Sequence, residues 1–153
     1  MTRPPTVLRA PTLADATSIA RLADELGYPA SPRMIEERLA RLLPLDHQFL
    51  RVAENSRGVV VGWIHAAEEE LLESGRHCEI YGLVVGKDAC GNGIGRALLV
   101  VAEAWAIQRG LFQISVRSNT RRQDAHPFYL HLGYGQTKTQ HVYRKRLPDN
   151  RAG

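Results

Sequence analysis

The sequence has few cysteines and lacks a long hydrophobic run. Cys78 and Cys90 are its only cysteines. They are too few to staple a secreted scaffold, and neither stands in a Cys-x-x-Cys or Cys/His metal spacing, so we expect two free thiols. No apolar run approaches the ~20 residues that a membrane-spanning helix requires, and the N-terminus lacks a basic segment followed by an apolar stretch. Together these absences predict a cytoplasmic protein.

The sequence also lacks a concentrated charge and a recognisable metal motif. Its formal net charge is +4, with the basic residues spread along the chain rather than gathered in one tract. Nucleic-acid binding rests only on this excess, which a small ligand with phosphate groups explains equally well. The six histidines are scattered without a His-Glu-x-x-His spacing. No metal is therefore expected.

The 153 residues, 44% of them hydrophobic, fit a single domain, expected to span residues 1–153 with a core at about 6–147. A short strand is predicted at 7–9. A helix capped by Thr12 follows and ends at Gly27, and a second helix begins after Ser31 and stops at Pro44.

Strands dominate the middle of the predicted domain. Residues 49–53 and 59–66 flank a turn-forming quartet at 55–58 and are predicted to form a hairpin. The acidic stretch 68–75 is interpreted as a connection, followed by a strand at 78–85.

The last third alternates helices and strands. A long helix is predicted from Ile94 to Gly110, a strand at 113–117, a helix capped by Asp124 that ends near Leu132, and a closing strand at 137–147. This order indicates a mixed α/β domain.

Three glycines at alternate positions, Gly91, Gly93 and Gly95, separate the strand that ends at Val85 from the long helix. Glycines let backbone amides approach a ligand, and a helix start leaves amides unpaired at its positive dipole end, so this loop predicts an anion site. A dinucleotide fingerprint would place glycine or alanine where Arg96 stands, and a P-loop would need Gly-Lys-Ser/Thr.

The chain resembles the GNAT acetyltransferase superfamily, whose signature is Gln or Arg, two residues, Gly, one residue, then Gly or Ala. Gly93 and Gly95 match it, while Cys90 replaces the first Gln or Arg. Segments 79–85 and 125–134 are similar to the family's preceding strand and downstream helix. The resemblance implies a single α/β domain with a mixed, mostly antiparallel sheet flanked by helices. It also implies transfer of the acetyl group of acetyl-CoA to an amine by direct attack in a ternary complex.

The resemblance implies a set of site residues. Tyr129 matches the tyrosine that protonates the departing thiolate, although a core aromatic is the alternative interpretation. The residues implied to bind the cofactor are Leu83, Val84, Val85, Gly91, Gly93, Gly95, Arg96 and Asn119. Pairing through the late strands, as in similar proteins, implies a homodimer.

Glu79 is the first candidate for a general base, and its strand parity predicts that Tyr81 and Leu83 share its face. His65 and Glu68 are alternatives, as are ordered water and a base-free route. Tyr28 and Glu68 are candidates for contacting the acceptor. The acceptor itself stays open between a polyamine, aminoglycoside-like or amino-acid amine and a protein amine. A non-catalytic acyl-CoA-binding regulatory module is the alternative function.

Overall fold

The computed structural model describes residues 6–117 and 125–149. The chain divides into two compact units, Met1–Arg117 and Ser118–Gly153, and each is described by itself. No helix in these described ranges is both long enough and apolar enough to cross a membrane.

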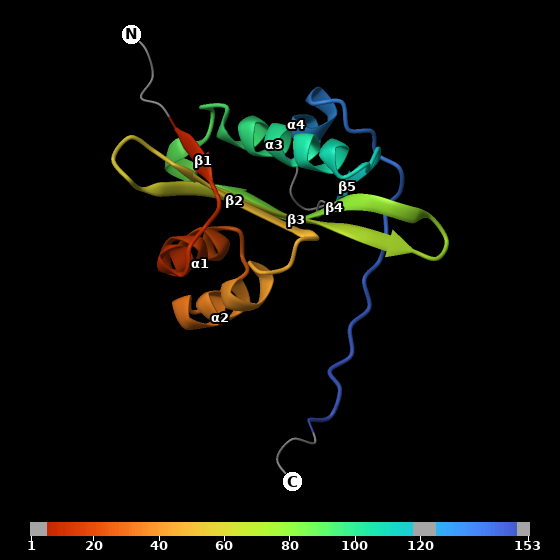
Figure 1. The fold of residues 1–153 in the computed structure, drawn as a ribbon, viewed down its shortest axis with the longest axis horizontal. Helices are drawn as coiled ribbons and strands as arrows, with labels where there is room; N and C mark the ends of the chain where they lie inside the picture. The colour runs from red at the N-terminus through yellow and green to blue at the C-terminus, as the bar shows by residue number, and fades with distance from the viewer. Residues whose placement is uncertain (1–5, 118–124, 150–153) are drawn as a thin grey trace. The chain divides into compact units, whose positions relative to one another are not determined.

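A five-stranded mixed sheet forms the centre of the first unit (Figure 1). Its strands are β1 (Val7–Arg9), β2 (Gln48–Glu54), β3 (Val60–Leu71), β4 (Gly75–Val85) and β5 (Ile114–Val116), lying side by side in that order. The first four pair antiparallel, and β5 runs parallel to β4. The predicted fold class, a mixed and mostly antiparallel sheet flanked by helices, is confirmed.

Helices cover both faces of the sheet (Figure 1). α1 (Ala16–Glu25) and α2 (Pro32–Leu42) pack on one face, hereafter the α1–α2 face, and α3 (Ile94–Gln108) packs on the other, the α3 face. The short 3-10 turns η1 (Leu13–Asp15) and η2 (Lys87–Ala89) precede α1 and α3. The predicted Ser31 cap is confirmed, since its hydroxyl accepts a hydrogen bond from the Met34 amide at 3.2 Å. Thr12 is instead the N-cap of η1, and Asp15 is the N-cap of α1.

The core lies between these layers. On the α1–α2 face, Leu22 and Leu39 are buried against Val52 and Val84 of the sheet. Each such burial contributes about 1.5–3 kcal/mol. On the α3 face the helix approaches so closely that a Cβ on Gly62 would lie 3.3 Å from the Ile94 side chain.

The β3–β4 hairpin is longer than the sequence predicted. The stretch 68–75 was expected to be an acidic connection, but residues 68–70 continue β3 and pair with residues 76–78 of β4. Gly75, with φ of +78°, closes the turn. The prediction was wrong because the acidic residues face partners across the strands: Glu70 pairs with Arg76 in the ladder, and opposite charges in such positions stabilise a sheet.

A β-bulge at Tyr81 reverses the side-chain alternation of β4. Consecutive residues of β3 pair with Gly82 and Ile80, so Tyr81 is an extra residue on β4. Leu83 therefore faces the α3 side, whereas Glu79 faces the α1–α2 side. The prediction that Leu83 shares the face of Glu79 was wrong, because counting by twos assumes a ladder without a bulge.

The second unit contains α4 (Ala125–His131), which is followed by Gly133 with φ of +91°. This agrees with the predicted helix, while its expected cap, Asp124, lies outside the described residues. The predicted strand at 137–147 was wrong: residues 135–149 form neither helix nor strand and are exposed. Strand-forming residues need a neighbouring strand, and the described part of the chain pairs none with them.

Candidate active site

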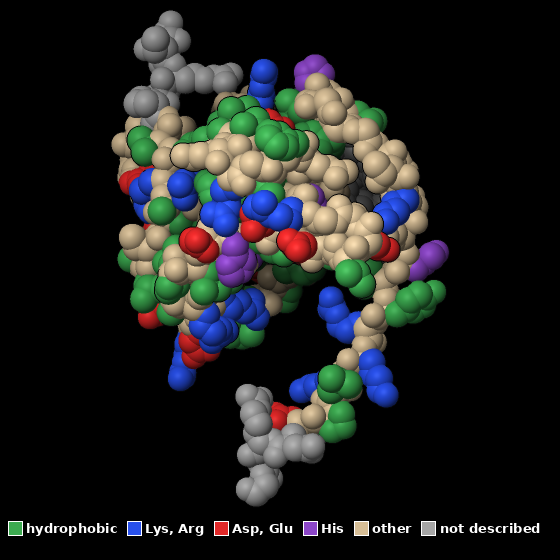
Figure 2. Space-filling model, turned by 45° about the vertical axis from the view of Figure 1, so that its right-hand side comes forward, with side chains coloured by type: hydrophobic (Ala, Val, Ile, Leu, Met, Phe, Trp, Pro, Cys, Tyr) green, Lys and Arg blue, Asp and Glu red, His purple; other side chains and the backbone are tan. Residues whose placement is uncertain are grey.

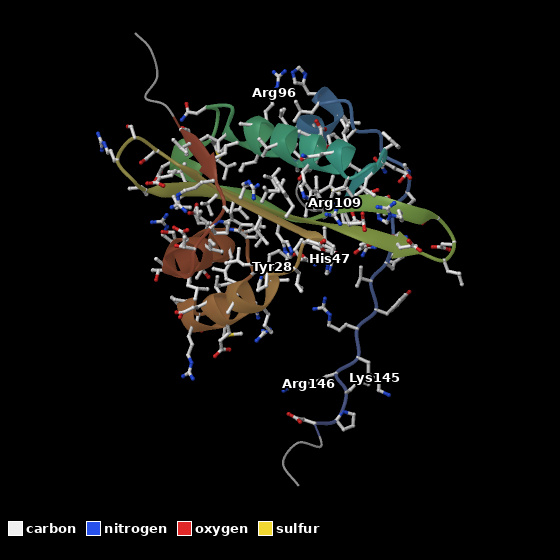
Figure 3. The ribbon with its side chains drawn as sticks, in the orientation of Figure 1. Tyr28, His47, Arg96, Arg109, Lys145 and Arg146 are labelled. Atoms are coloured by element: carbon white, nitrogen blue, oxygen red, sulfur yellow. The ribbon has the colours of Figure 1, made fainter. Side chains whose placement is uncertain are left out.

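The glycine loop leads into α3 with two backbone conformations that only glycine adopts easily. Gly91 and Gly93 have φ of +84° and +77°, and Gly93 is the N-cap of α3. A Cβ on either residue would meet nothing within 4 Å, so the space over the loop is open. Gly95 lies in the first helical turn, and Arg96 projects from that turn away from the sheet (Figure 3). The first amides of α3 have no partner within the helix, and with the positive end of the helix dipole they can bind a diphosphate.

Strand β4 leaves β5 shortly before this loop. β5 pairs with Cys78, Glu79 and Ile80, and β4 then continues through residues 81–85 beyond the last β5 pair. We call this point the fork. Within the described residues, the β4 backbone past the fork pairs with β3 on one side only, so its other edge offers amides and carbonyls to a ligand. The predicted cofactor residues Leu83, Val84 and Val85 lie on this segment.

Three ionisable side chains meet at the fork on the α1–α2 face. Glu69 of β3 is directly opposite His77 of β4, and Glu79 follows two residues later on the same face. The His77 Nε2 lies 3.6 Å from Glu69 Oε1 and 3.7 Å from Glu79 Oε1. We call Glu69, His77 and Glu79 the fork cluster. One donor atom from each lies within 4.8 Å of the others, a set that also suits a metal ion.

Glu79 is the most buried carboxylate of the fork cluster. Its side chain is 7% exposed, and its Oε2 atom is buried without a hydrogen-bond partner. The nearest cation is Arg117, whose Nε lies 3.9 Å from Glu79 Oε1 on a side chain that is 74% exposed. Burial raises the pKa of Glu79, and the charge of Glu69 adds to the rise, against the opposing effect of Arg117. A carboxylate of this kind accepts a proton readily.

Tyr81 and His65 border the fork cluster. The Tyr81 hydroxyl donates a hydrogen bond to Glu69 Oε2, and burial together with this carboxylate raises the pKa of Tyr81. His65 contacts the Tyr81 ring edge-on and lies 2.6 Å from Gln48 Oε1. Burial lowers the pKa of His65. His65 is therefore held by neighbours and lies beside the fork cluster rather than in it.

Glu68, predicted as an acceptor contact, lies on the α3 face. Its Oε1 accepts a hydrogen bond from Arg76 at 2.6 Å and lies 3.6 Å from the Nε of Arg109. Its pKa is lowered, mainly by the bond from Arg76. The structure thus separates two adjacent carboxylates, with Glu68 held by arginines and Glu69 beside the predicted base.

Charges of both signs intermingle over the face shown in Figure 2, where acidic and basic side chains lie next to one another. The ion pair between Arg9 and Asp15, with an N to O distance of 2.8 Å, is a second example in the first unit. A mixed surface of this kind does not favour the nucleic-acid hypothesis, which rested on net charge alone.

The other predicted residues are dispersed. Tyr28 lies in the connection between α1 and α2 and is 66% exposed (Figure 3). Tyr129 is in α4, with its ring against Phe128 and Tyr134, and so belongs to the second unit. Asn119 lies outside the described residues.

Both cysteines are free, as predicted. Cys78 is buried, and this burial raises the pKa of its thiol to about 11, so it is inert as a nucleophile. Cys90 is exposed at the entry to the glycine loop, with its sulfur 3.4 Å from the Gly86 carbonyl oxygen. Cys90 thus occupies the first position of the glycine signature.

A sheet flanked on both faces, a glycine loop at a helix start and a forked strand beside it define an α/β protein with an open edge along β4. The model of the acetyltransferase (GNAT) family matches residues 17–134. The chain belongs to this family, as its resemblance predicted.

One curated protein is similar to half of the chain. The chain is 35% identical over 74 residues to YhdJ of Bacillus subtilis (strain 168), an uncharacterized N-acetyltransferase, and the match spans 48% of this chain and 51% of that protein. The chain thus matches about half the length of this curated relative.

Solved structures agree in fold. The aminoglycoside N-acetyltransferase AAC(6')-Iy in complex with CoA superposes with a TM-score of 0.84 at 17% identity, covering 95% of this chain and 98% of that one. A transcriptional regulator from Bacillus halodurans C-125 superposes with a TM-score of 0.83 at 23% identity, covering 92% and 100%. At these identities the likeness concerns the fold.

Reasoning from the sequence missed His77 and Glu69 as members of the site. In the sequence both are part of a charged stretch, and neither belongs to a Cys-x-x-Cys, Cys/His or His-Glu-x-x-His spacing. The signal that would have found them is the cross-strand register, because a residue pair directly opposite in a hairpin brings side chains within about 5 Å.

Proposed function

We propose that this protein transfers the acetyl group of acetyl-CoA to a primary amine by direct attack within a ternary complex. The observation that carries the proposal is the glycine loop at the start of α3 placed next to the fork of β4. The loop amides bind the diphosphate, and the unpaired edge of residues 81–85 pairs with the pantetheine arm. The thioester is thereby held beside the fork.

The proposed chemistry uses groups of the fork and, from the second unit, Tyr129. A backbone amide of β4 stabilises the oxyanion that forms on the thioester carbonyl. Glu79 takes a proton from the acceptor ammonium, and its burial and raised pKa support this role. Tyr129 is the proposed acid for the thiolate of CoA. The amine then attacks the carbonyl carbon directly, and the bond from that carbon to sulfur breaks. The thiolate takes the Tyr129 proton, and the second proton lost by the nitrogen restores Tyr129.

The acceptor is proposed to be a cationic primary amine, because carboxylates line the face of β4 from which it would approach. Tyr28 is a proposed contact of this acceptor. We also propose that the protein works in the cytoplasm, which agrees with its two free thiols. A homodimer is proposed through residues 137–147, where Tyr143 is 92% exposed.

An acceptor screen tests this function. Acetyl-CoA is incubated with polyamines, aminoglycosides, amino acids and peptide amines, and free thiol is measured. We expect thiol release that depends on at least one amine. Binding of acetyl-CoA without such release by any amine would favour the non-catalytic regulatory module instead.

The cofactor site has a matched test in α3. Gly93→Val and Gly110→Val each place a side chain where φ is near +78° and where nothing lies within 4 Å, one at each end of the helix. Both should lower the free energy of unfolding by about 1–2 kcal/mol. Only Gly93→Val should weaken acetyl-CoA binding, by about tenfold or more. Equal affinities for the two variants, measured by calorimetry, would contradict the proposed diphosphate site.

A further inference from the structure

The proposed reaction releases a proton at a buried place. An acceptor amine enters as an ammonium ion, and the products are an amide and a neutral thiol, so each turnover leaves one proton for the solvent. Glu79 receives this proton, yet its side chain is only 7% exposed. Before the next turnover Glu79 must pass the proton on, and its neighbours decide where it goes.

Five charged or titratable groups surround Glu79 in the described structure: Arg117, Tyr81, His77, Glu69 and Cys78. Cys78 is buried and faces the α3 side together with Glu68, away from Glu79. Arg117 carries no site that accepts a proton. The Tyr81 hydroxyl already donates a hydrogen bond to Glu69, so it is not free to take a proton from Glu79. His77 remains, with its Nε2 between the two carboxylates, 3.7 Å from Glu79 and 3.6 Å from Glu69. Exposure rises along this path, from 7% for the Glu79 side chain and 8% for His77 to 25% for Glu69.

We propose that His77 and Glu69 form the outlet through which the proton taken up by Glu79 reaches the solvent. This inference rests on the proposed function. The ammonium N–H bond breaks as Glu79 gains the proton; His77 Nε2 then takes it from Glu79 and gives it to Glu69, which releases it to water. Each gap is longer than a hydrogen bond, so a side-chain rotation or a bridging water completes each transfer. His77 and Glu69 are positioning and relay residues, and neither contacts the thioester.

The test compares His77→Gln with His47→Gln. His47 precedes β2 and is exposed (Figure 3), and its carbonyl oxygen accepts a hydrogen bond from the Glu68 amide of β3. Its side chain therefore serves as a matched control. We expect His77→Gln to lower kcat by about tenfold or more without changing KM for acetyl-CoA, and His47→Gln to leave both unchanged. Melting temperature and acetyl-CoA affinity are measured for each variant.

Chemical rescue separates a relay from a structural role. In His77→Gly, added imidazole should restore turnover in proportion to its free-base concentration, because it replaces the missing proton carrier. A histidine that only filled space would give no dependence on the basicity of the added compound. If His77 variants fail to fold, Glu69→Gln is compared with Glu70→Gln, whose native side chain is exposed. We then expect kcat to be about threefold lower for Glu69→Gln and to depend on the buffer concentration.

Three results would overturn the outlet. One is an equal kcat for His77→Gln and His47→Gln, and another is the absence of imidazole rescue in a folded His77→Gly. The third is loss of wild-type activity with a chelator and its return with Zn²⁺, which would assign the fork cluster to a metal. If the wild-type protein releases no thiol with any amine, the proposed function itself is refuted. An active enzyme whose His77 variants keep full kcat refutes only the outlet.

Discussion

The two faces of the β3–β4 hairpin carry similar side chains in opposite electrostatic states. On the α3 face, Glu68 has the guanidinium groups of Arg76 and Arg109 within reach, and its pKa is lowered. On the α1–α2 face, Glu69 and Glu79 face His77, the one nearby arginine, Arg117, is 74% exposed, and the pKa of Glu79 is raised. A salt bridge on one side fixes the hairpin, while the shortage of cations on the other leaves a carboxylate able to take up a proton.

The largest effect that distinguishes the faces should be on turnover. Glu79→Gln removes the proposed base while keeping its size, and we expect kcat to fall by about 100-fold or more. Glu68→Gln, one face away, should leave kcat unchanged. Steady-state kinetics of thiol release with the best amine measure both. A Glu79→Gln variant with wild-type kcat would mean that the amine loses its proton before it binds.

The next effect should be on stability, and it should depend on pH. Because the folded pKa of Glu79 lies above its usual 4.5, this group stabilises the fold at acidic pH, and that contribution is lost as pH rises through the folded pKa. Glu79→Gln should therefore raise the melting temperature by about 2–4 °C at neutral pH, and the gain should vanish near pH 4. Thermal unfolding monitored by circular dichroism across this range checks it.

The smallest effect is expected on the α3 face, where replacing the carboxylate should lower stability rather than raise it. The lowered pKa of Glu68 contributes stability above its unfolded pKa that is lost as pH falls through the folded value. Glu68→Gln should cost about 0.5 kcal/mol at neutral pH and less in high salt, because the pair lies near the surface. Urea unfolding at low and high ionic strength measures this. A stabilising Glu68→Gln would contradict the contrast between the faces.

Local signals made much of the fold predictable. Ser31 followed by Pro32 marks the start of α2, and Gly110 marks the end of α3, because a cap or a positive φ depends on a few adjacent residues. The glycine loop was predictable for the same reason. Its proposed function as a diphosphate site depends on which strand precedes it, and the family motif supplied that strand.

Long-range pairing accounts for what the sequence did not reveal. An acidic run such as 68–70 has the composition of a loop, and only the opposite strand makes it part of a sheet. The bulge at Tyr81 is also a property of two strands together, and it changed the face assigned to Leu83. Glu79 was predicted from its strand, but its partners His77 and Glu69 required the register.

The one-sided pairing of β4 beyond the fork has a consequence for the protein without ligand. An uncovered strand edge is a template for association with other chains, and a cofactor arm that fills it would act as an added strand. The apoprotein should then be the form that self-associates, and saturating acetyl-CoA should protect it by mass action, by about 2.7 kcal/mol at 100 times its Kd. Catalytic readiness and resistance to aggregation would in this way depend on the same stretch of backbone.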